Sequence, residues 1–205
     1  MVPESLDLPP LYAGVLVGGK STRMGRPKQL LEVDDSTFIE RIAAVLGTFA
    51  REVVLLGAGP VPASCDGLLR LGDPPGLGGP MAGMLAAFCH EPSVAWLFVG
   101  CDQPLMDEAA VTWLAGQRAP GTWAVVPSLP GGRVQPLFAL YEPRSAELLQ
   151  GLADMGISAP RRLAEDARVS TPVIPPELAR CWQSIDTPDD LATLRAQGRD
   201  SIRGS

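Results

Sequence analysis

The first candidate for chemistry is a glycine-rich stretch near the N-terminus. Residues 14–21 read GVLVGGKS and match G-x-x-x-x-G-K-[ST], the spacing of the phosphate-binding loop of many ATPases and GTPases. In that loop the residues between the glycines must curl so that their N–H groups surround a phosphate. Here Val15, Leu16 and Val17 are typical of the end of a buried strand, and β-branched residues suit a tight curl poorly. We therefore interpret the match as an accident of register and predict a loop that begins at Gly18.

The loop that begins at Gly18 concentrates positive charge. It continues as GGKSTRMGRPK and carries four cations: Lys20, Arg23, Arg26 and Lys28. Glycines let a backbone approach a ligand closely, and cations together with backbone donors neutralise phosphate groups. From the charge alone, two interpretations stay open: a triphosphate-binding loop or a solvated basic turn.

A carboxylate follows another strand-like run. Asp102 comes directly after AWLFVGC, at the carboxyl edge of a sheet, where open α/β folds bind ligands. Mg²⁺ prefers such oxygen ligands and bridges phosphates while it keeps several waters. The alternative is that Asp102 caps a helix that starts after Pro104. The residues by themselves favour neither interpretation.

Strand-like and helix-like segments alternate along the chain. The apolar runs with strand character are residues 11–17, 52–57, 94–100, 122–127 and 134–141. The early runs are apolar nearly throughout, which is typical of parallel strands covered by helices on both faces. The turn at residues 130–133, PGGR, predicts an antiparallel hairpin. We therefore expect an α/β fold with a mostly parallel sheet.

Helical spacing marks the segments between these strands. Ser36 is the predicted cap of a helix over residues 39–46, and Pro80 suits the first turn of a helix over residues 81–88. The sequence DTPDD from Asp186 predicts a last helix from about Pro188 to Ala196. We expect residues 66–79 to form a loop near the carboxyl edge of the sheet.

Length and charge limit the possible classes of protein. With 205 residues the chain can bury one substantial core but is too short for two ordinary domains. We predict a disordered lead-in of residues 1–10, a single domain of residues 11–197 and a tail of residues 198–205. The net charge of −6 and the scattered basic residues argue against a nucleic-acid partner.

The sequence lacks the signals of membrane proteins, secreted proteins and zinc or disulfide-stabilised proteins. The apolar runs are far shorter than the roughly 20 residues of a membrane-spanning helix, so we expect no membrane association. The acidic, proline-rich start does not resemble a secretory signal, so we expect a cytoplasmic protein. His90 is the only histidine, and the four cysteines have no C-x-x-C spacing. A zinc site and a disulfide framework are therefore not expected.

Several motifs taken together resemble a known family, the MobA-like nucleotidyltransferases, and within it the molybdenum cofactor guanylyltransferases. The motifs are, in order, LVGGKSTRMGRPK (16–28), GGPMAGMLAA (78–87), GCDQP (100–104), VQPLFALY (134–141) and SIDTPDDL (184–191). The resemblance implies a Rossmann-like, three-layer α/β/α fold of the nucleotide-diphospho-sugar transferase type. It implies transfer of GMP from GTP to the phosphate of molybdopterin with release of pyrophosphate. It also implies dependence on Mg²⁺ and transient partner proteins that supply or receive the cofactor.

The resemblance assigns roles residue by residue. It implies nucleotide binding by Leu16, Val17, Gly18, Gly19, Lys20, Lys28, Asp73, Gly79 and Asp102. The implied catalytic residues are Lys28, Arg23 and Asp102, and the implied metal ligand is Asp102. Asp186 is either a second metal ligand or only a helix cap. On the acceptor side, Gln135 is implied as a ligand for the pterin or its phosphate and Arg133 as a second contact; the alternatives are an edge-strand glutamine and a solvated hairpin residue.

The sequence also departs from the family. Its second strand ends in VVLLGAG (53–59), where the family commonly has an asparagine that touches the nucleotide. Backbone groups near Leu56 and Gly57 replace that contact, or base selection differs. Because GRPKQLL is shared with cytidylyltransferases of the same superfamily, CTP stays an alternative to GTP. A nucleotidyltransferase that acts on a sugar 1-phosphate or another small phosphate is a further alternative. The alternatives from other classes are a P-loop hydrolase that depends on Lys20 and a non-catalytic nucleotide-binding protein.

Overall fold

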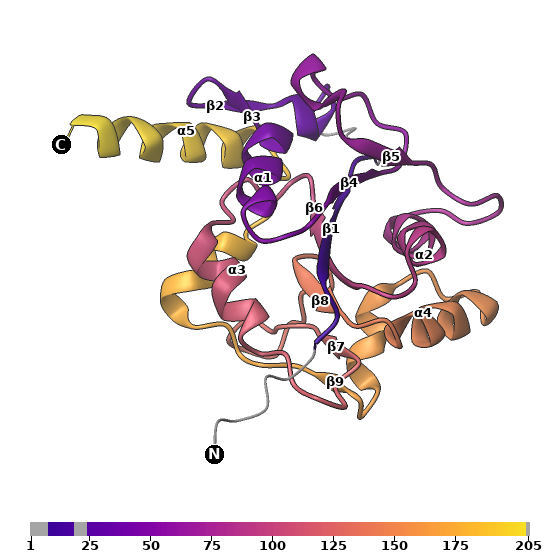
Figure 1. The fold of residues 1–205 in the computed structure, drawn as a ribbon. Helices are drawn as coiled ribbons and strands as arrows, with labels where there is room; N and C mark the ends of the chain where they lie inside the picture. The colour runs from indigo at the N-terminus through magenta and orange to yellow at the C-terminus, as the bar shows by residue number, and fades with distance from the viewer. Residues whose placement is uncertain (1–7, 19–23, 204–205) are drawn as a thin grey trace.

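The centre of the fold is a seven-stranded, mostly parallel sheet (Figure 1). A computed structural model describes residues 8–18 and 24–203, with side chains up to residue 197. In spatial order the strands are β5 (Leu69–Leu71), β4 (Val53–Leu56), β1 (Leu11–Leu16), β6 (Ala95–Gly100), β8 (Ala139–Tyr141), β7 (Ala124–Val125) and β9 (Val169–Ser170). The first four are parallel to one another, whereas β8 is antiparallel to both of its neighbours. The predicted mostly parallel sheet with an antiparallel element is confirmed.

Helices cover both faces of the sheet. One face packs against α1 (Phe38–Gly47) and α3 (Glu108–Ala115), and the other against α2 (Pro80–His90) and α4 (Ser145–Asp154) (Figure 1). Side chains of each strand alternate between the two cores, since Leu97 of β6 packs in the first and Trp96 and Phe98 in the second. The expected three-layer α/β/α architecture is therefore confirmed.

Strand β1 decides the interpretation of GVLVGGKS. Gly14, Val15 and Leu16 are extended and pair in parallel with both β4 and β6, so they do not curl around a phosphate. A Cβ atom on Gly14 would lie 2.6 Å from Leu56 Cδ1 and 2.7 Å from Phe98 Cδ1. This glycine is therefore needed for packing under neighbouring side chains, and the predicted accident of register is confirmed for residues 14–17. Lys20 and Ser21 lie outside the described residues.

A short hairpin follows the glycine-rich loop. It consists of β2 (Glu32–Val33) and β3 (Ser36–Thr37), joined by Asp34 and Asp35 with positive φ angles of 49° and 61°, as a two-residue hairpin turn requires. Thr37 then caps α1: its Oγ1 accepts from Glu40 N, and its own N–H donates to Glu40 Oε2 at 2.8 Å. The prediction that Ser36 caps this helix is wrong by one residue, because the helix begins at Phe38 and the side chain that accepts from Glu40 N is that of Thr37.

A third, small core joins the two ends of the chain. Its buried side chains come from the hairpin region and from the C-terminal segment: Leu31, Val33, Phe38, Ile185, Leu191 and Leu194. The last two belong to α5 (Pro188–Arg203), which continues past the predicted end near Ala196. The Arg195 guanidinium donates to Glu32 O at 2.8 and 3.1 Å, which fixes α5 beside β2. Residues 24–38 and 184–194 are thereby held together beside the carboxyl edge of the sheet.

Other elements differ from the sequence-based expectations. The segment 66–79, predicted as a loop, contains the edge strand β5. Of the run 134–141 only the last three residues form β8, while an antiparallel bridge between Ser128 and Val134 closes the predicted turn at 130–133. Among residues 8–18 and 24–203 there are also four 3₁₀ helices: η1 (Lys28–Leu30), η2 (Ala63–Cys65), η3 (Pro160–Glu165) and η4 (Pro176–Trp182).

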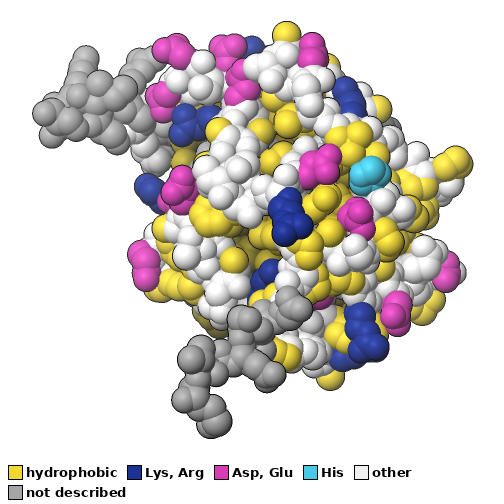
Figure 2. Space-filling model, viewed as in Figure 1, with side chains coloured by type: hydrophobic (Ala, Val, Ile, Leu, Met, Phe, Trp, Pro, Cys, Tyr) yellow, Lys and Arg dark blue, Asp and Glu magenta, His cyan; other side chains and the backbone are white. Residues whose placement is uncertain are grey.

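The first described residues of the chain are hydrogen-bonded to the rest of the fold. Residues 1–7 of the predicted lead-in lie outside the described residues, whereas the Pro9 and Pro10 carbonyls accept from Arg118 and Ala95; the predicted division into domains stays a prediction. No helix in the described part of the chain is long and apolar enough to cross a membrane. On the face that Figure 2 shows, lysine and arginine side chains are scattered among acidic ones rather than gathered in a stripe.

Candidate active site

A cleft opens at the carboxyl ends of β1, β4 and β6. Its cavity measures about 350 Å³. Seven of the residues that the sequence assigned to nucleotide binding line it: Leu16, Val17, Gly18, Lys28, Asp73, Gly79 and Asp102. The remaining two, Gly19 and Lys20, lie outside the described residues, as does Arg23, so their assigned roles stay predictions. The cleft is thus in the place where open α/β sheets bind ligands.

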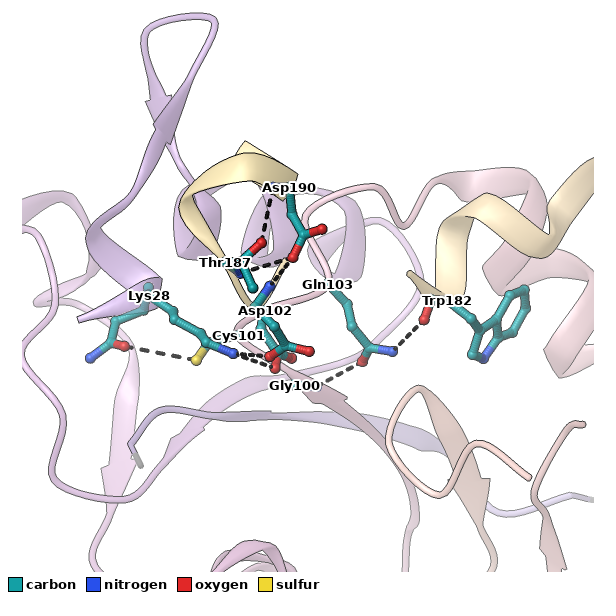
Figure 3. A network of polar contacts seen from close by, with 10 residues as sticks. Lys28, Gly100, Cys101, Asp102, Gln103, Trp182, Thr187 and Asp190 are labelled. Atoms are coloured by element: carbon teal, nitrogen blue, oxygen red, sulfur yellow. Dashed lines mark hydrogen bonds and ion pairs between the residues drawn. The ribbon is translucent and has the colours of Figure 1, made fainter. Parts of the chain in front are cut away.

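Lys28 lies between two carboxylates. Its Nζ is 3.2 Å from Asp102 Oδ2 and also donates a hydrogen bond to Asp186 Oδ1 (Figure 3). The side chains are 17% exposed for Lys28, 27% for Asp102 and 52% for Asp186. Burial lowers the pKa of Lys28, but the hydrogen bonds and charges of the two carboxylates outweigh it, so the pKa is raised overall. The ammonium is therefore charged and held between two anionic groups.

The end of β6 sets the position of Asp102. A Cβ atom on Gly100 would lie 2.6 Å from Asp102 Oδ1, so the carboxylate lies over a position that only glycine leaves free. The Gly100 N–H donates to Gln103 Oε1 at 3.1 Å (Figure 3). The Ile185 N–H donates to the Asp102 carbonyl at 2.8 Å. The second bond ties the turn after β6 to the segment that carries Asp186. The two carboxylates therefore converge although they are far apart in the sequence.

Neither carboxylate is a helix cap. Helix α3 begins at Glu108 and is capped by Asp107, whose Oδ1 accepts from Ala110 N at 2.9 Å. At the start of α5, Thr187 Oγ1 accepts from Asp190 N, and Thr187 N donates to Asp190 Oδ2 at 2.8 Å (Figure 3). The cap alternatives for Asp102 and Asp186 are therefore wrong. Both side chains bind Lys28 instead.

The pair of carboxylates fits a divalent cation that is shared with a ligand. In the part of the chain that the structure describes, no three His, Cys, Asp or Glu side chains are grouped as a metal site. Mg²⁺ does not need such a cage, because it is usually bound by one or two carboxylates together with phosphate oxygens and waters. Asp102 and Asp186 already bracket one positive charge. Their oxygens are the donors that Mg²⁺ prefers, and the assignment itself stays a prediction.

The opposite side of the cavity consists mainly of backbone. Gly57, with a φ of +107°, would place a Cβ atom 2.4 Å from Val17 O, so only glycine fits here. Arg70 Nε donates to Gly57 O at 3.0 Å and holds this loop. Gly79, with a φ of +72°, lies at the start of α2, and it lines the cavity together with Asp73. The Gly57 N–H already donates to Leu71 O at 2.8 Å, so the group that this wall offers to a nucleoside is the Asp73 carboxylate.

The lining also includes Gly100, Cys101 and Leu137, to which the sequence had assigned no part in binding. Gly100 and Cys101 adjoin Asp102, and that neighbourhood is the only signal in the sequence that could have indicated them. Leu137 is an ordinary apolar residue with no such signal. Burial raises the pKa of the Cys101 thiol to about 11, so it is a neutral S–H group at neutral pH.

A second cavity of about 270 Å³ lies beside the first. Arg133, Gln135, Trp182, Ser184 and Asp186 are among its lining residues. The structure thus brings together the two residues that the sequence assigned to the acceptor. Because Asp186 lines this cavity and binds Lys28, which lines the other, the pair marks the boundary between them.

Strand order, cleft and charged cluster together define a class of protein, the Rossmann-like nucleotidyltransferases. The sequence model of the MobA-like NTP transferase domain matches residues 13–170. The chain is 35% identical over 147 residues to a probable molybdenum cofactor guanylyltransferase of Bacillus cereus, a match that covers 69% of this chain and 73% of that protein. The chain therefore belongs to the family of MobA-like NTP transferases.

Solved structures agree on the fold. Molybdopterin-guanine dinucleotide biosynthesis protein A from Archaeoglobus fulgidus superposes with a TM-score of 0.75 at 22% identity, over 92% of this chain and 99% of that one. The 2-C-methyl-D-erythritol 4-phosphate cytidylyltransferase from Thermus thermophilus superposes with a TM-score of 0.65 at 20% identity, over 94% and 99%. Both similarities concern the fold alone, and they confirm the predicted nucleotidyltransferase architecture.

Proposed function

We propose that this protein transfers GMP from GTP to the phosphate of molybdopterin and releases pyrophosphate. The observation that carries the proposal is the cluster of Lys28, Asp102 and Asp186 at the boundary of two cavities. A transferase must hold a donor and an acceptor on either side of the reacting phosphorus. The name of the Bacillus cereus relative supports the choice of substrates.

The proposed reaction needs alignment and charge neutralisation rather than an acid or base. An oxygen of the acceptor phosphate attacks the α-phosphorus of the nucleotide in line, and the bond from that phosphorus to the oxygen bridging to the β-phosphate breaks. Pyrophosphate leaves with the bonding electrons. Lys28 lines the cavity, and in this proposal its ammonium neutralises the negative charge that is redistributed over the phosphates. Asp102 and Asp186 would hold Mg²⁺, which supplies further neutralisation of the phosphate oxygens.

The second cavity is the proposed acceptor site. Gln135 offers an amide to the pterin, and Arg133 offers a positive charge to the acceptor phosphate. Bound there, the acceptor would approach the nucleotide past Asp186. Transient partner proteins would have to deliver the cofactor to this opening and remove the product, and we expect this to take place in the cytoplasm.

The identity of the nucleotide base is the part of the proposal for which there is a specific alternative, CTP in place of GTP. Asp73 could accept from guanine N1–H and N2–H, which favours GTP, but it could also accept from the amino group of cytosine. The absence of a polar side chain in the β4 loop, where the sequence reads LLGAG, keeps CTP as the second candidate. Both candidates share the fold and the mechanism.

The test is pyrophosphate release in the presence of Mg²⁺, measured with GTP, CTP or ATP, with and without molybdopterin. We expect release only when GTP and the acceptor are both present. Release with CTP instead would keep the mechanism and change the base. Orthophosphate release without acceptor would indicate a hydrolase, and nucleotide binding without any release would indicate a non-catalytic binding protein.

A further inference from the structure

Gln29 is a buried polar residue next to the proposed catalytic lysine. Its side chain is 2% exposed, although it belongs to the short helix η1 at the mouth of the cleft. An amide that is removed from water costs free energy unless it is hydrogen-bonded, and an apolar side chain of the same size would fill this space without that cost. The partners of the Gln29 amide therefore indicate what it does.

The amide of Gln29 connects loops that follow three different strands. Its Nε2 donates to the Pro60 carbonyl at 3.0 Å, in the loop after β4. Its Oε1 accepts from Cys101 Sγ at 3.8 Å, directly after β6 (Figure 3). Gln29 itself belongs to the segment that follows β1. A Cβ atom on Gly59 would lie 2.5 Å from Gln29 Nε2, so the glycine there leaves the room that the amide occupies.

These contacts connect the two halves of the ion pair described above. Lys28 precedes Gln29 in a 3₁₀ helix of three residues, so the backbone of Lys28 moves little unless Gln29 moves too. On the other side, Cys101 precedes Asp102. The hydrogen bond between Gln29 and Cys101 therefore links the backbone that carries the lysine to the backbone that carries the carboxylate. Gln29 itself is buried and is not among the residues that line the cavity, whereas Cys101 is.

We propose that Gln29 is a positioning residue that holds Lys28 at the correct place for phosphate transfer. It touches no substrate in this role and acts through Lys28, whose backbone it holds against the turn at Cys101. The proposal rests on the proposed function, since it assumes that Lys28 acts on the nucleotide. Misplacement of a catalytic group by about 1 Å can cost about 100-fold in rate, so a loss of this bracing has a measurable effect.

The test is a double-mutant cycle with Gln29→Met, Lys28→Ala and the double variant. Methionine keeps the length of the side chain and removes both hydrogen bonds. We expect Gln29→Met to lower kcat about 10- to 100-fold when Lys28 is present, with little change in KM for the acceptor. In the Lys28→Ala background the same substitution should change kcat by less than about twofold, because there is no lysine left to position.

Ser145→Ala is the matched control for lost stability. Ser145 is fully buried and donates from Oγ to Glu142 O at 2.7 Å, in a helix outside the cleft. Both Gln29→Met and Ser145→Ala should lower Tm, but only the first should lower kcat. Equal effects of Gln29→Met on kcat in both backgrounds, or a lowered Tm with unchanged kcat, would overturn the proposal.

Two further readouts separate this proposal from the proposed function. The same cycle measured as GTP affinity by calorimetry needs no acceptor, so it is informative even if no pyrophosphate is released. A crystal structure of Gln29→Met without nucleotide needs no ligand at all. We expect Lys28 Nζ to move out of hydrogen-bond distance of Asp102 Oδ2, and an unchanged distance would contradict the positioning role.

Discussion

Lys28 is the residue at which distant parts of the sequence meet chemically. Its ammonium binds Asp102, which follows the central strand β6, and Asp186, which precedes the last helix. In the free protein this single positive charge lies between two carboxylates and offsets the charge of only one of them. A divalent cation that uses the same two carboxylates must compete with the ammonium, whereas a nucleotide supplies phosphates to which Lys28 can turn.

This competition leads to a prediction with opposite signs for two ligands. Lys28→Ala should raise the affinity for free Mn²⁺ about tenfold, because a neighbouring positive charge is removed from the two carboxylates. The same variant should bind GTP more weakly. Lys28→Arg keeps the charge and serves as the control, and Asp102→Asn should lower the Mn²⁺ affinity. Electron paramagnetic resonance of Mn²⁺ without nucleotide measures this, and an unchanged affinity in Lys28→Ala would show that the cation does not use these carboxylates.

At the scale of elements, the last residue of β6 affects the site more directly than the residues in the middle of the strand. Throughout β6 the side chains are buried and bind nothing in the cleft, but Gly100 ends the strand under the Asp102 carboxylate. The Asp102 carboxylate can take its observed position because Gly100 has no side chain there. This feature is separable from the stability of the fold, because the nearest atom that a larger residue would meet belongs to the Asp102 side chain.

Gly100→Ala tests this separation. The added methyl group would lie 2.6 Å from Asp102 Oδ1, so the carboxylate must rotate away. We expect kcat to fall about 100-fold while Tm changes by only a few degrees. Gly47→Ala in α1 is the control, since its added methyl group has no neighbour within 4 Å. Equal activity of Gly100→Ala and the wild type would mean that the orientation of Asp102 is not set by this contact.

The elements also differ in how far the sequence predicts them. β1, β4 and β6 are continuous apolar runs, and their place in a buried parallel sheet follows from that pattern. The edge strand β5 reads LRL and is partly exposed, so only its pairing with β4 makes it a strand. The N-cap of α1 also depends on pairing between strands. Thr37, rather than Ser36, caps the helix because the hairpin of β2 and β3 ends at Thr37.

The candidate site, too, could be predicted from the sequence only in part. Lys28 and Asp102 stand in motifs that indicate phosphate and metal chemistry, so both could be proposed from the sequence. The contact of Lys28 with Asp186 joins residues 158 positions apart and depends on the small core of Leu31, Phe38, Ile185 and their neighbours. No local pattern encodes that contact. The bridging role of Gln29 is equally hidden, because a glutamine after a lysine looks like an ordinary surface residue.

At the scale of the whole molecule, the cleft is formed where several segments of the chain meet, and no single segment forms it. Its lining comes from the ends of β1, β4 and β6, from η1 and from the start of α2. The segment of Asp186 is held against them by the third core and by the Ile185–Asp102 backbone bond. A ligand that binds across this junction contacts parts of the chain that separate on unfolding. Binding should therefore stabilise the entire fold.

The stabilisation can be predicted and its metal dependence tested. A ligand that binds only the folded state at 100 times its Kd adds about 2.7 kcal/mol to the free energy of unfolding. In a domain of this size that corresponds to a rise in Tm of roughly 5–10 °C. We expect GTP with Mg²⁺ to produce such a rise in thermal denaturation, and GTP with a chelator to produce a much smaller one, because the phosphates then face Asp102 and Asp186 uncompensated. Asp102→Asn should remove the difference between the two conditions. An equal rise with and without the chelator in the wild type would mean that nucleotide binding does not involve a divalent cation at these carboxylates.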